Sequence, residues 1–298
     1  MALTLLIDSS SMLYRAYFSV PDTVRTDAGD QVNGAYGFIN MLARLISDLR
    51  PARMACALDV DWRPQWRVDL IESYKAHRVA EVAAGAAAVP DENIEWQIEV
   101  AAELIDLAGL AVVGAADYEA EDVIGALLPK TRGDVAIVSG DRDLFQLVRD
   151  PRIWVLYPRR GVSDLIRVDE AEIERRYAIP GRSYADFATL RGDPSDGLPG
   201  VRGIGEKTAS RLIATYGSLD AILRAARGTT SGPLAKVAAS ADYVERAKRV
   251  VRITSEAPVG EVDLSLPRHA PDKRLAAKAR KLALNGPVAR LVQAIQSR

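Results

Sequence analysis

Residues 117–128 read DYEAEDVIGALL, in which four carboxylates fall within six residues and an apolar run follows. A helix N-terminus stabilises each nearby acid by only about 0.3–1 kcal/mol, which is too little to hold four like charges together. A cation is therefore required. Hard divalent ions such as Mg²⁺ and Mn²⁺ prefer carboxylate oxygens, and surplus negative charge can bind two of them. The segment therefore predicts part of a metal site.

Helical geometry limits which of these acids can share one site. Glu119 and Asp122 are three residues apart, so they are neighbours on a helix surface. Glu121 lies well round the helix from Glu119, at about 100° per residue. Both reach one site only if Glu119 stands at or before the first turn, an arrangement in which Asp117 would cap the helix.

Three apolar runs elsewhere in the chain end beside an acid. The acids in question are Asp8, Asp59, Asp141 and Asp143. Because ligands bind beyond the carboxyl ends of parallel strands, we expect these four side chains to converge with the acids of 117–122. Each one alone could be a helix N-cap or a loop residue. Agreement among three strands favours a common site.

A second acidic group lies in residues 190–213, LRGDPSDGLPGVRGIGEKTASRLI, where Asp193 and Asp196 stand on a Gly/Pro loop. On spacing alone, turn aspartates are an equal alternative. The glycines of GVRGIGEKTA suit a tight turn between two helices, with Lys207 at the start of the second. Exposed backbone N–H groups in such a turn can hold a DNA phosphate. A plain interhelical turn fits the pattern equally well.

Composition excludes other ligand chemistry. The chain of 298 residues contains two histidines, His77 and His269, and one cysteine, Cys56. Structural or thiolate zinc sites therefore have no ligands, and no intrachain disulfide can form. We expect Cys56 to be a buried, inert thiol. Any metal chemistry must use oxygen donors suited to Mg²⁺ or Mn²⁺.

Charge is unevenly distributed along the chain. The formal net charge of −1 carries no nucleic-acid signal. Lysine and arginine nevertheless dominate three segments, which are 202–211, 245–252 and 268–281. This pattern suits an acidic pocket framed by basic surfaces. No run of about 20 apolar residues could span a membrane, and the N-terminal stretch lacks a basic signal region, so we expect a cytoplasmic protein.

The elements that must position these residues alternate along the first half of the chain. Short apolar runs that predict buried strands lie at 3–7, 53–58, 110–114, 135–139 and 153–157. The best predicted helices are 34–50, 92–109 and 118–128. Buried strands separated by helices predict an α/β fold with a mainly parallel central sheet flanked by helices.

The second half of the sequence is helical. We expect an α/β core over 1–167, a helical subdomain over 168–254 and a C-terminal segment, 255–298, that packs on the core. Residues 79–91, VAEVAAGAAAVPD, are Ala-rich without an amphipathic face. They predict a mobile segment that bridges two helices.

Five ordered motifs together resemble a known family, the bacterial and phage 5′-nucleases. This family includes flap endonucleases, 5′-3′ exonucleases and the nuclease domain of bacterial DNA polymerase I. The motifs are LLIDSSSMLYRAYF, ALDVDWRPQWRVDLIESYKAHR, YEAEDVIGAL, VSGDRDLFQL and GDPSDGLPGVRGIGEKTASRLI, and they cover Asp8 to about residue 230. The resemblance implies a PIN-like core and a two-metal nuclease that hydrolyses DNA at 5′ flaps and 5′ ends, in replication (Okazaki-fragment processing) and repair.

The resemblance also assigns the metal ligands to two groups. The first group is Asp8, Asp59, Glu119, Glu121 and Asp122, and the second is Asp141, Asp143, Asp193 and Asp196. The family more often has aspartate where Glu121 stands. It commonly has asparagine at the position of Gly197, and we expect only a local loop effect from that difference.

The family's helical arch over the site matches residues 70–95. Lys75 and Arg78 would add positive charge at the phosphoryl oxygens, Tyr74 would stack on a base, and Arg67 would contact a phosphate. The hairpin resembles the family's helix-3-turn-helix, which grips duplex DNA and often binds K⁺. Its DNA-binding residues would be Arg202, Gly203, Gly205 and Lys207.

The chain ends with no room for a polymerase domain. The resemblance therefore implies a free-standing, monomeric nuclease of the nucleoid that works with a separate polymerase and ligase. One alternative is a catalytically silent DNA-junction binder on the same scaffold, which would typically have lost acids. A PIN-like RNase and a phosphotransfer protein acting through Asp59 are the others, and both leave Asp193, Asp196 and the hairpin unexplained.

Overall fold

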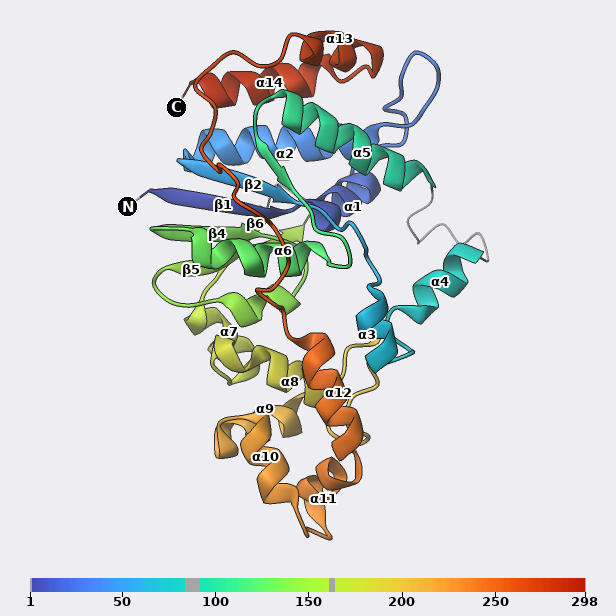
Figure 1. The fold of residues 1–298 in the computed structure, drawn as a ribbon, viewed down its shortest axis with the longest axis vertical. Coiled ribbons are helices and arrows are strands. Elements are labelled where there is room, and N and C mark those ends of the chain that lie inside the picture. Colours follow the sequence, from blue (N-terminus) through green and yellow to red (C-terminus); the bar gives the residue numbers. More distant parts are fainter. Residues whose placement is uncertain (1, 84–91, 161–163, 298) are drawn as a thin grey trace.

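The computed structural model describes residues 2–83, 92–160 and 164–297, and Figure 1 shows a sheet between helical layers with a helical extension at one end. Within the described residues the sheet has six strands in the order β3-β2-β1-β4-β5-β6. The strands are β1 (Leu3–Asp8), β2 (Arg53–Ala57), β3 (Ala111–Val113), β4 (Asp134–Val138), β5 (Ile153–Arg160) and β6 (Asp164–Val168). The first five are parallel and β6 is antiparallel. The expected α/β class with a mainly parallel sheet is confirmed.

Strand β6 was not expected. It pairs with β5, Val168 opposite Val155, at the edge of the sheet. Only Val168 among its residues is buried. The apolar signal of the strand is therefore weak, and pairing with its neighbour decides its structure.

The central strand β1 is buried on both faces. Leu5 and Ile7 pack with Leu42 in one apolar cluster, whereas Leu6 packs with Val123 in the other. This division follows from the two-residue period of a strand, which sends alternate side chains to opposite faces. The helices of the first face are α1 (Ser9–Ser19), α2 (Asn33–Leu49), α5 (Glu92–Leu107), α13 (Arg274–Lys281) and α14 (Asn285–Gln296).

Helix α2 shows why this layer forms. Its buried residues Phe38, Leu42 and Leu45 recur at helical spacing and make an apolar stripe toward the sheet. At Gly37 an added Cβ would lie 2.9 Å from the Cβ of Ala16, so the missing side chain lets α2 approach α1 closely. Helix α1 begins at Ser9, directly after Asp8, and is therefore held against the end of β1.

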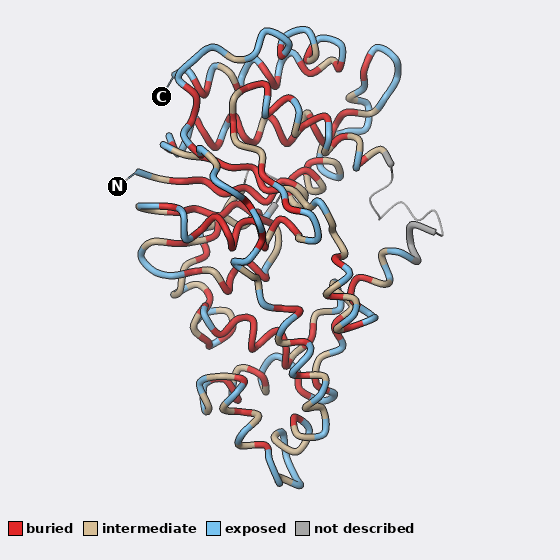
Figure 2. The backbone as a smooth tube through the Cα atoms, in the orientation of Figure 1, coloured by how far each residue is buried: buried red, intermediate tan, exposed pale blue. Residues whose placement is uncertain are grey.

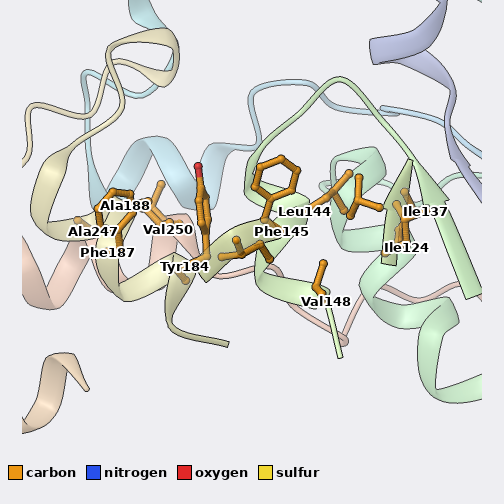
Figure 3. Close-up of a cluster of buried hydrophobic side chains, with 14 of the residues drawn as sticks. Ile124, Ile137, Leu144, Phe145, Val148, Tyr184, Phe187, Ala188, Ala247 and Val250 are labelled. Carbon is orange, nitrogen blue, oxygen red and sulfur yellow. The ribbon is translucent and has the colours of Figure 1, made fainter. Parts of the chain in front are cut away.

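The opposite face of the sheet carries α6 (Ala120–Leu127) and continues without a break into the helical extension. Figure 3 shows this shared core, with Ile124 and Ile137 at the sheet end and Phe187 and Ala247 at the other. Figure 2 shows the buried residues running through the sheet into the first helices below it. The helices of the extension are α7 (Glu170–Tyr177), α8 (Tyr184–Arg191), α9 (Glu206–Tyr216), α10 (Leu219–Ala226), α11 (Gly232–Ala239) and α12 (Ala241–Val251). Short 3₁₀ turns are η1 (Leu128–Lys130), η2 (Asp143–Leu147), η3 (Gly181–Ser183) and η4 (Pro194–Asp196).

A strap over residues 252–266 returns the chain from α12 to the far end of the sheet, as Figure 1 shows. The N–H of Thr254 donates to Asp122 Oδ1 at 3.1 Å, and the N–H of Met54 donates to the carbonyl of Leu264 at 2.7 Å. Helix α14 then packs on α2, where Arg290 Nε donates to Asn40 Oδ1 at 2.7 Å. The chain therefore connects the sheet and the helical extension twice, once from β6 to α7 and once through the strap.

The base of the expected arch consists of α3 (Gln65–Leu70) and α4 (Ala76–Ala83), which Figure 1 places to one side of the sheet and above α12. Arg246 Nη1 donates to the carbonyl of Leu70 at 3.3 Å, which connects α12 to this base. Helix α4 includes residues 79–83 of the Ala-rich stretch, and the rest of that stretch, 84–91, lies outside the described residues. No helix in the described part of the chain is long and apolar enough to cross a bilayer.

Candidate active site

A cleft of about 1230 Å³ lies at the carboxyl edge of the sheet, between the sheet and the arch base. Most of the predicted acids line it. These are Asp8, Asp59, Glu119, Glu121, Asp141, Asp143, Asp193 and Asp196. Lys75 and Arg78 line the same cleft. The structure therefore brings together side chains that are up to 188 positions apart in the sequence (196 minus 8).

Asp8 stands where β1 ends and α1 begins. Its Oδ1 accepts the N–H of Ser11 at 3.2 Å, which makes it the N-cap of α1, and its Oδ2 accepts the hydroxyl of Ser139 at 2.5 Å. Burial, followed by the charges of Asp59 and Asp141, raises the pKa of Asp8 to about 7. Both causes oppose the ionised form of Asp8.

Asp59 follows β2, and its side chain accepts a hydrogen bond from the first residue of helix α6. Its Oδ1 accepts the N–H of Ala120 at 2.6 Å, and its own N–H is bonded to Ser10 Oγ at 3.2 Å. Burial and the charge of Glu119 raise the pKa of Asp59. The capping role that we expected for Asp117 belongs to Asp59, because Asp117 has a φ of 65° and its carbonyl instead accepts the indole N–H of Trp66 at 3.1 Å.

Glu119 occupies the N-cap position of α6, which satisfies the condition for Glu119 and Glu121 to face one cleft. Its Oε1 accepts Arg67 Nη1 at 2.6 Å and the hydroxyl of Tyr74 at 2.5 Å, and its Oε2 accepts Lys75 Nζ. Burial alone would raise the pKa of Glu119, but the charges of Lys75 and Arg67 lower it. Glu119 is thus held ionised by cations of the arch base.

Glu121 and Asp122 point to different places. Glu121 lines the cleft, and its Oε1 is 2.9 Å from Arg67 Nη2. Burial raises the pKa of Glu121 well above its usual value, although the Arg67 charge opposes the shift. Asp122 does not line the cleft: it is fully buried between Arg67 and the strap, and its Oδ2 has no hydrogen-bond partner.

The second acidic group spans two loops. Asp141 Oδ1 accepts the N–H of Asp143 at 2.8 Å, and burial with the charge of Asp196 raises the pKa of Asp141 to about 6. Burial and the neighbouring acids raise the pKa of Asp143 well above its usual value. Asp193 caps η4 through the N–H of Ser195 at 2.9 Å.

The arch base is docked on the loop that carries Asp196. Arg78 Nη2 is 3.0 Å from Asp196 Oδ1, and the N–H of Lys75 donates to the carbonyl of Asp196 at 2.9 Å. Lys75 has a φ of 49°, a left-handed conformation that a side chain disfavours, and the Asp196 carbonyl helps to hold it there. The two catalytic cations that we predicted are therefore each bonded to a different acidic group.

Two family models together match residues 3–274 of the chain. The model of the 5′-3′ exonuclease N-terminal resolvase-like domain matches residues 3–178, and that of the 5′-3′ exonuclease C-terminal SAM fold matches residues 179–274. The chain belongs to the 5′-3′ exonuclease family. The predicted family and class of enzyme, a 5′-3′ exonuclease or flap endonuclease, are confirmed.

Relatives of this exonuclease occur alone and within longer chains. A 5′-3′ exonuclease of Streptomyces coelicolor is 44% identical over 297 residues, which cover 97% of this chain and 98% of the relative. DNA polymerase I of Mycobacterium tuberculosis is 40% identical over 223 residues, or 74% of this chain and 24% of the polymerase. Among solved structures, the flap endonuclease of bacteriophage T5 has a TM-score of 0.67 at 15% identity and covers 99% of this chain and 98% of its own. This last likeness shows the shared fold.

Two residues of the exonuclease lie elsewhere than we predicted. Arg67 was expected to contact a phosphate and Tyr74 to stack on a base, but both are buried, at 0% and 2% exposure. Arg67 binds the carboxylates of α6, and the Tyr74 hydroxyl donates to Glu119. In this conformation neither side chain can contact DNA, because both are buried and bonded to acids of α6.

The surroundings of Gly197 also differ from the local loop effect that we expected at this position. Its φ is 69°, and a Cβ there would lie 2.0 Å from the carbonyl oxygen of Ser73 in the arch base. The hydroxyl of Ser73 in turn donates to the carbonyl of Gly197 at 2.7 Å. A side chain at this position would therefore displace the arch base, and the effect would not be confined to the loop.

The predicted DNA-binding residues of the hairpin do not line the acidic cleft. Gly203 has a φ of 76° and Gly205 is the N-cap of α9, so the turn leads directly into that helix. Arg202 and Lys207 are exposed. Lys236 Nζ donates to the carbonyl of Gly203 at 3.1 Å, which places one ammonium group at the turn.

Sequence reasoning missed the hydroxyl groups that orient the acids. The hydroxyl oxygen of Ser10 accepts the N–H of Asp59, and that of Ser11 accepts the N–H of Gly140. The hydroxyl of Ser139 donates to Asp8 Oδ2 and accepts the N–H of Asp141. The run SSS directly after Asp8 was a signal that could have identified the first two. Arg15 and Phe18, which also line the cleft, follow one and two turns later on α1.

The donor chemistry of the cleft fits hard divalent cations, because every acid offers oxygen. Burial and the charges of neighbouring acids raise the pKa values of Asp8 and Asp141, and a bound cation would favour their ionised forms. Within the described residues, however, no three or more His, Cys, Asp or Glu side chains are grouped closely enough to hold an ion as they stand. Lys75 and Arg67 take up the oxygens of Glu119 instead.

Proposed function

We propose that this exonuclease hydrolyses DNA at 5′ flaps and at 5′ ends next to duplex, with Mg²⁺ or Mn²⁺ ions in the acidic cleft. The observation that carries the proposal is one cleft lined by eight acids from both predicted groups and closed on one side by Lys75 and Arg78. The bacteriophage T5 flap endonuclease was solved in a complex with DNA and metal ions, and this supports the same chemistry here.

The residues that would hold the ions are the cleft acids. The ligands that we propose are Asp8, Asp59, Glu121, Asp141 and Asp143, which line the cleft. Among the described residues, the one ion pair between these acids and a lysine or arginine joins Glu121 to Arg67. Bound divalent ions supply an activated water and stabilise the charge on the leaving oxygen. Asp122 is not among the ligands that we propose, because it is buried off the cleft.

Lys75 and Arg78 would act on the scissile phosphate. Each is now bonded to an acid, Glu119 or Asp196, and a phosphate in the cleft offers both cations an alternative anionic partner. Their positive charge would stabilise the negative charge that develops on the phosphoryl oxygens. The acids orient the arch cations until substrate arrives.

The hairpin would hold the duplex next to the cut. The backbone of Gly203 and Gly205 and the side chains of Arg202 and Lys207 would bind phosphates without reading sequence. K⁺ at this turn is part of the proposal, bound to carbonyls other than that of Gly203, which already accepts Lys236. In the cell we place the exonuclease in the cytoplasm, at the nucleoid, as a monomer in Okazaki-fragment processing and repair beside a separate polymerase and ligase.

A labelled 5′-flap DNA tests the proposal. With Mg²⁺ or Mn²⁺ we expect cleavage near the junction, none in EDTA, and cleavage of a blunt duplex at least about tenfold slower. Binding without cleavage would favour the silent junction binder. Faster cleavage of an RNA flap than of the DNA flap would favour the RNase.

A further inference from the structure

Arg67 is the largest fully buried side chain of the described residues and carries a permanent positive charge. Its Nη1 is 2.6 Å from Glu119 Oε1, and its Nη2 is 2.9 Å from both Glu121 Oε1 and Asp122 Oδ1. One guanidinium group thus binds three carboxylates that are spread over the N-cap and first turn of α6.

The fork of Arg67 is itself held in place. Its Cζ lies 4.8 Å from the ring centroid of Trp66 and 5.8 Å from that of Tyr74, so aromatic rings flank the charge. Asp122 is also fixed from the other side by the N–H of Thr254 in the strap. Arg67, in α3 of the arch base, therefore binds α6 directly, and through Asp122 it is linked to the strap.

The geometry points to Arg67 as a positioning residue for the cleavage reaction. Its guanidinium fork sets where the carboxylates of Glu119 and Glu121 stand in the cleft wall, and it makes no contact with DNA. This inference rests on the proposed function, and it replaces the phosphate contact predicted from sequence. Lysine cannot take over fully, because an ammonium group lacks the planar fork that spans several carboxylates.

The experiment compares Arg67→Met and Arg67→Lys with wild type and with Leu42→Ala. Leu42 is fully buried in the cluster on the opposite face of the sheet, so its variant reports lost packing alone. The first readout is Mn²⁺ binding to DNA-free protein by electron paramagnetic resonance. Loss of a positive charge would by itself strengthen Mn²⁺ binding, so weaker binding isolates lost positioning.

We expect Mn²⁺ affinity to fall at least about tenfold in Arg67→Met and by less in Arg67→Lys, with no change in Leu42→Ala. The second readout is cleavage and binding of a 5′-flap DNA: kcat falls about 100-fold in Arg67→Met. The Kd for the flap, measured by fluorescence anisotropy in Ca²⁺, stays within about twofold, and so does its dependence on salt.

Unchanged or stronger Mn²⁺ binding in both Arg67 variants would overturn the inference. So would a loss of flap affinity with a salt slope smaller by about one, because that is the signature of a lost phosphate contact. If Arg67→Met does not fold, Arg67→Lys keeps a buried cation and decides the question. Failure of the wild type to cut a flap would overturn the proposed function and with it the role in cleavage. The Mn²⁺ titration needs no DNA, so it would still test separately whether Arg67 positions the carboxylates.

Discussion

The backbone of Gly197 lies directly against the carbonyl oxygen of Ser73, so close that a Cβ on Gly197 would stand 2.0 Å from that oxygen. This contact joins the loop of the second acidic group to the base of the arch. The same two segments exchange a hydrogen bond from Ser73 Oγ to the carbonyl of Gly197. The seating of the arch therefore depends on the absence of a side chain at one position.

Replacing Gly197 with alanine should reduce both stability and activity. The left-handed φ of 69° and the contact with Ser73 both oppose a Cβ, and we expect a loss of about 2–3 kcal/mol in the free energy of unfolding. The matched control is Gly228→Ala, because Gly228 has a φ of 73° but open space around it. Denaturant unfolding of both variants measures the difference, and equal losses would show that the contact contributes nothing.

The stability of the metal-free protein should depend on pH through Asp8 and Asp141. Their pKa values rise from 3.8 to about 7 and about 6, so the folded state binds protons more readily than the unfolded state. The stability that these groups contribute is present below about pH 4 and is lost as pH rises through the folded pKa values. Burial of the two carboxyl groups is the main physical cause, and repulsion from neighbouring acids adds to it.

Asp8→Asn and Asp141→Asn should therefore stabilise the metal-free protein at pH 8, on the order of 2 kcal/mol each, and by roughly half as much at pH 5. Thermal melts in EDTA at the two pH values measure this. Asp27→Asn, at an exposed position, serves as the control. The same stabilisation at both pH values would contradict the prediction.

Adding Mn²⁺ at pH 8 should raise the Tm of the wild type. An ion that binds only the folded state stabilises it by about 2.7 kcal/mol at 100 times its Kd. The shift should be smaller in Asp141→Asn, which lacks one of the proposed ligands. A melting temperature that saturating Mn²⁺ leaves unchanged would contradict the proposed metal site.

Removing the arch cations should slow cleavage more than it weakens binding. Lys75→Ala and Arg78→Ala each lose positive charge at the reacting phosphate, and we expect kcat to fall about 10²–10³-fold. Single-turnover cleavage of a flap gives the rate, and anisotropy gives the Kd. Arg44→Ala, at an exposed site in α2, is the control. Equal losses in kcat and affinity would mean that the cations only bind substrate.

Lys207→Ala should weaken binding of flap DNA more than it slows cleavage. Lys207 is exposed on the hairpin, and we expect the Kd for flap DNA to rise a few-fold and the salt slope to fall by about one, with kcat unchanged. Anisotropy at several salt concentrations measures the slope. A lower kcat with an unchanged slope would place Lys207 in the chemistry instead of in duplex binding.

The sequence by itself determined the five parallel strands of the sheet, their acidic edge and the helical second half. Short apolar runs such as 3–7 and 135–139, separated by helices, favour buried parallel strands, and parallel strands bring their carboxyl ends to one edge. Asp8, Asp59 and Asp141 could therefore be assigned to one cleft before any coordinate was known. The helix period likewise placed α2, α5 and α6 within about two residues of their observed bounds.

Only the tertiary structure decided which charged residues face the cleft and which are buried behind it. Arg67 and Glu119 are 52 residues apart, and no local pattern shows that the arginine turns inward to bind α6. The family resemblance places Asp122 with Glu121 in one group of metal ligands, yet Asp122 is buried between Arg67 and the strap. Gly197 reads as an ordinary turn glycine until Ser73 packs against it. The physical reason is common to all three, since burial and ion pairing depend on segments that meet only when the whole chain has folded.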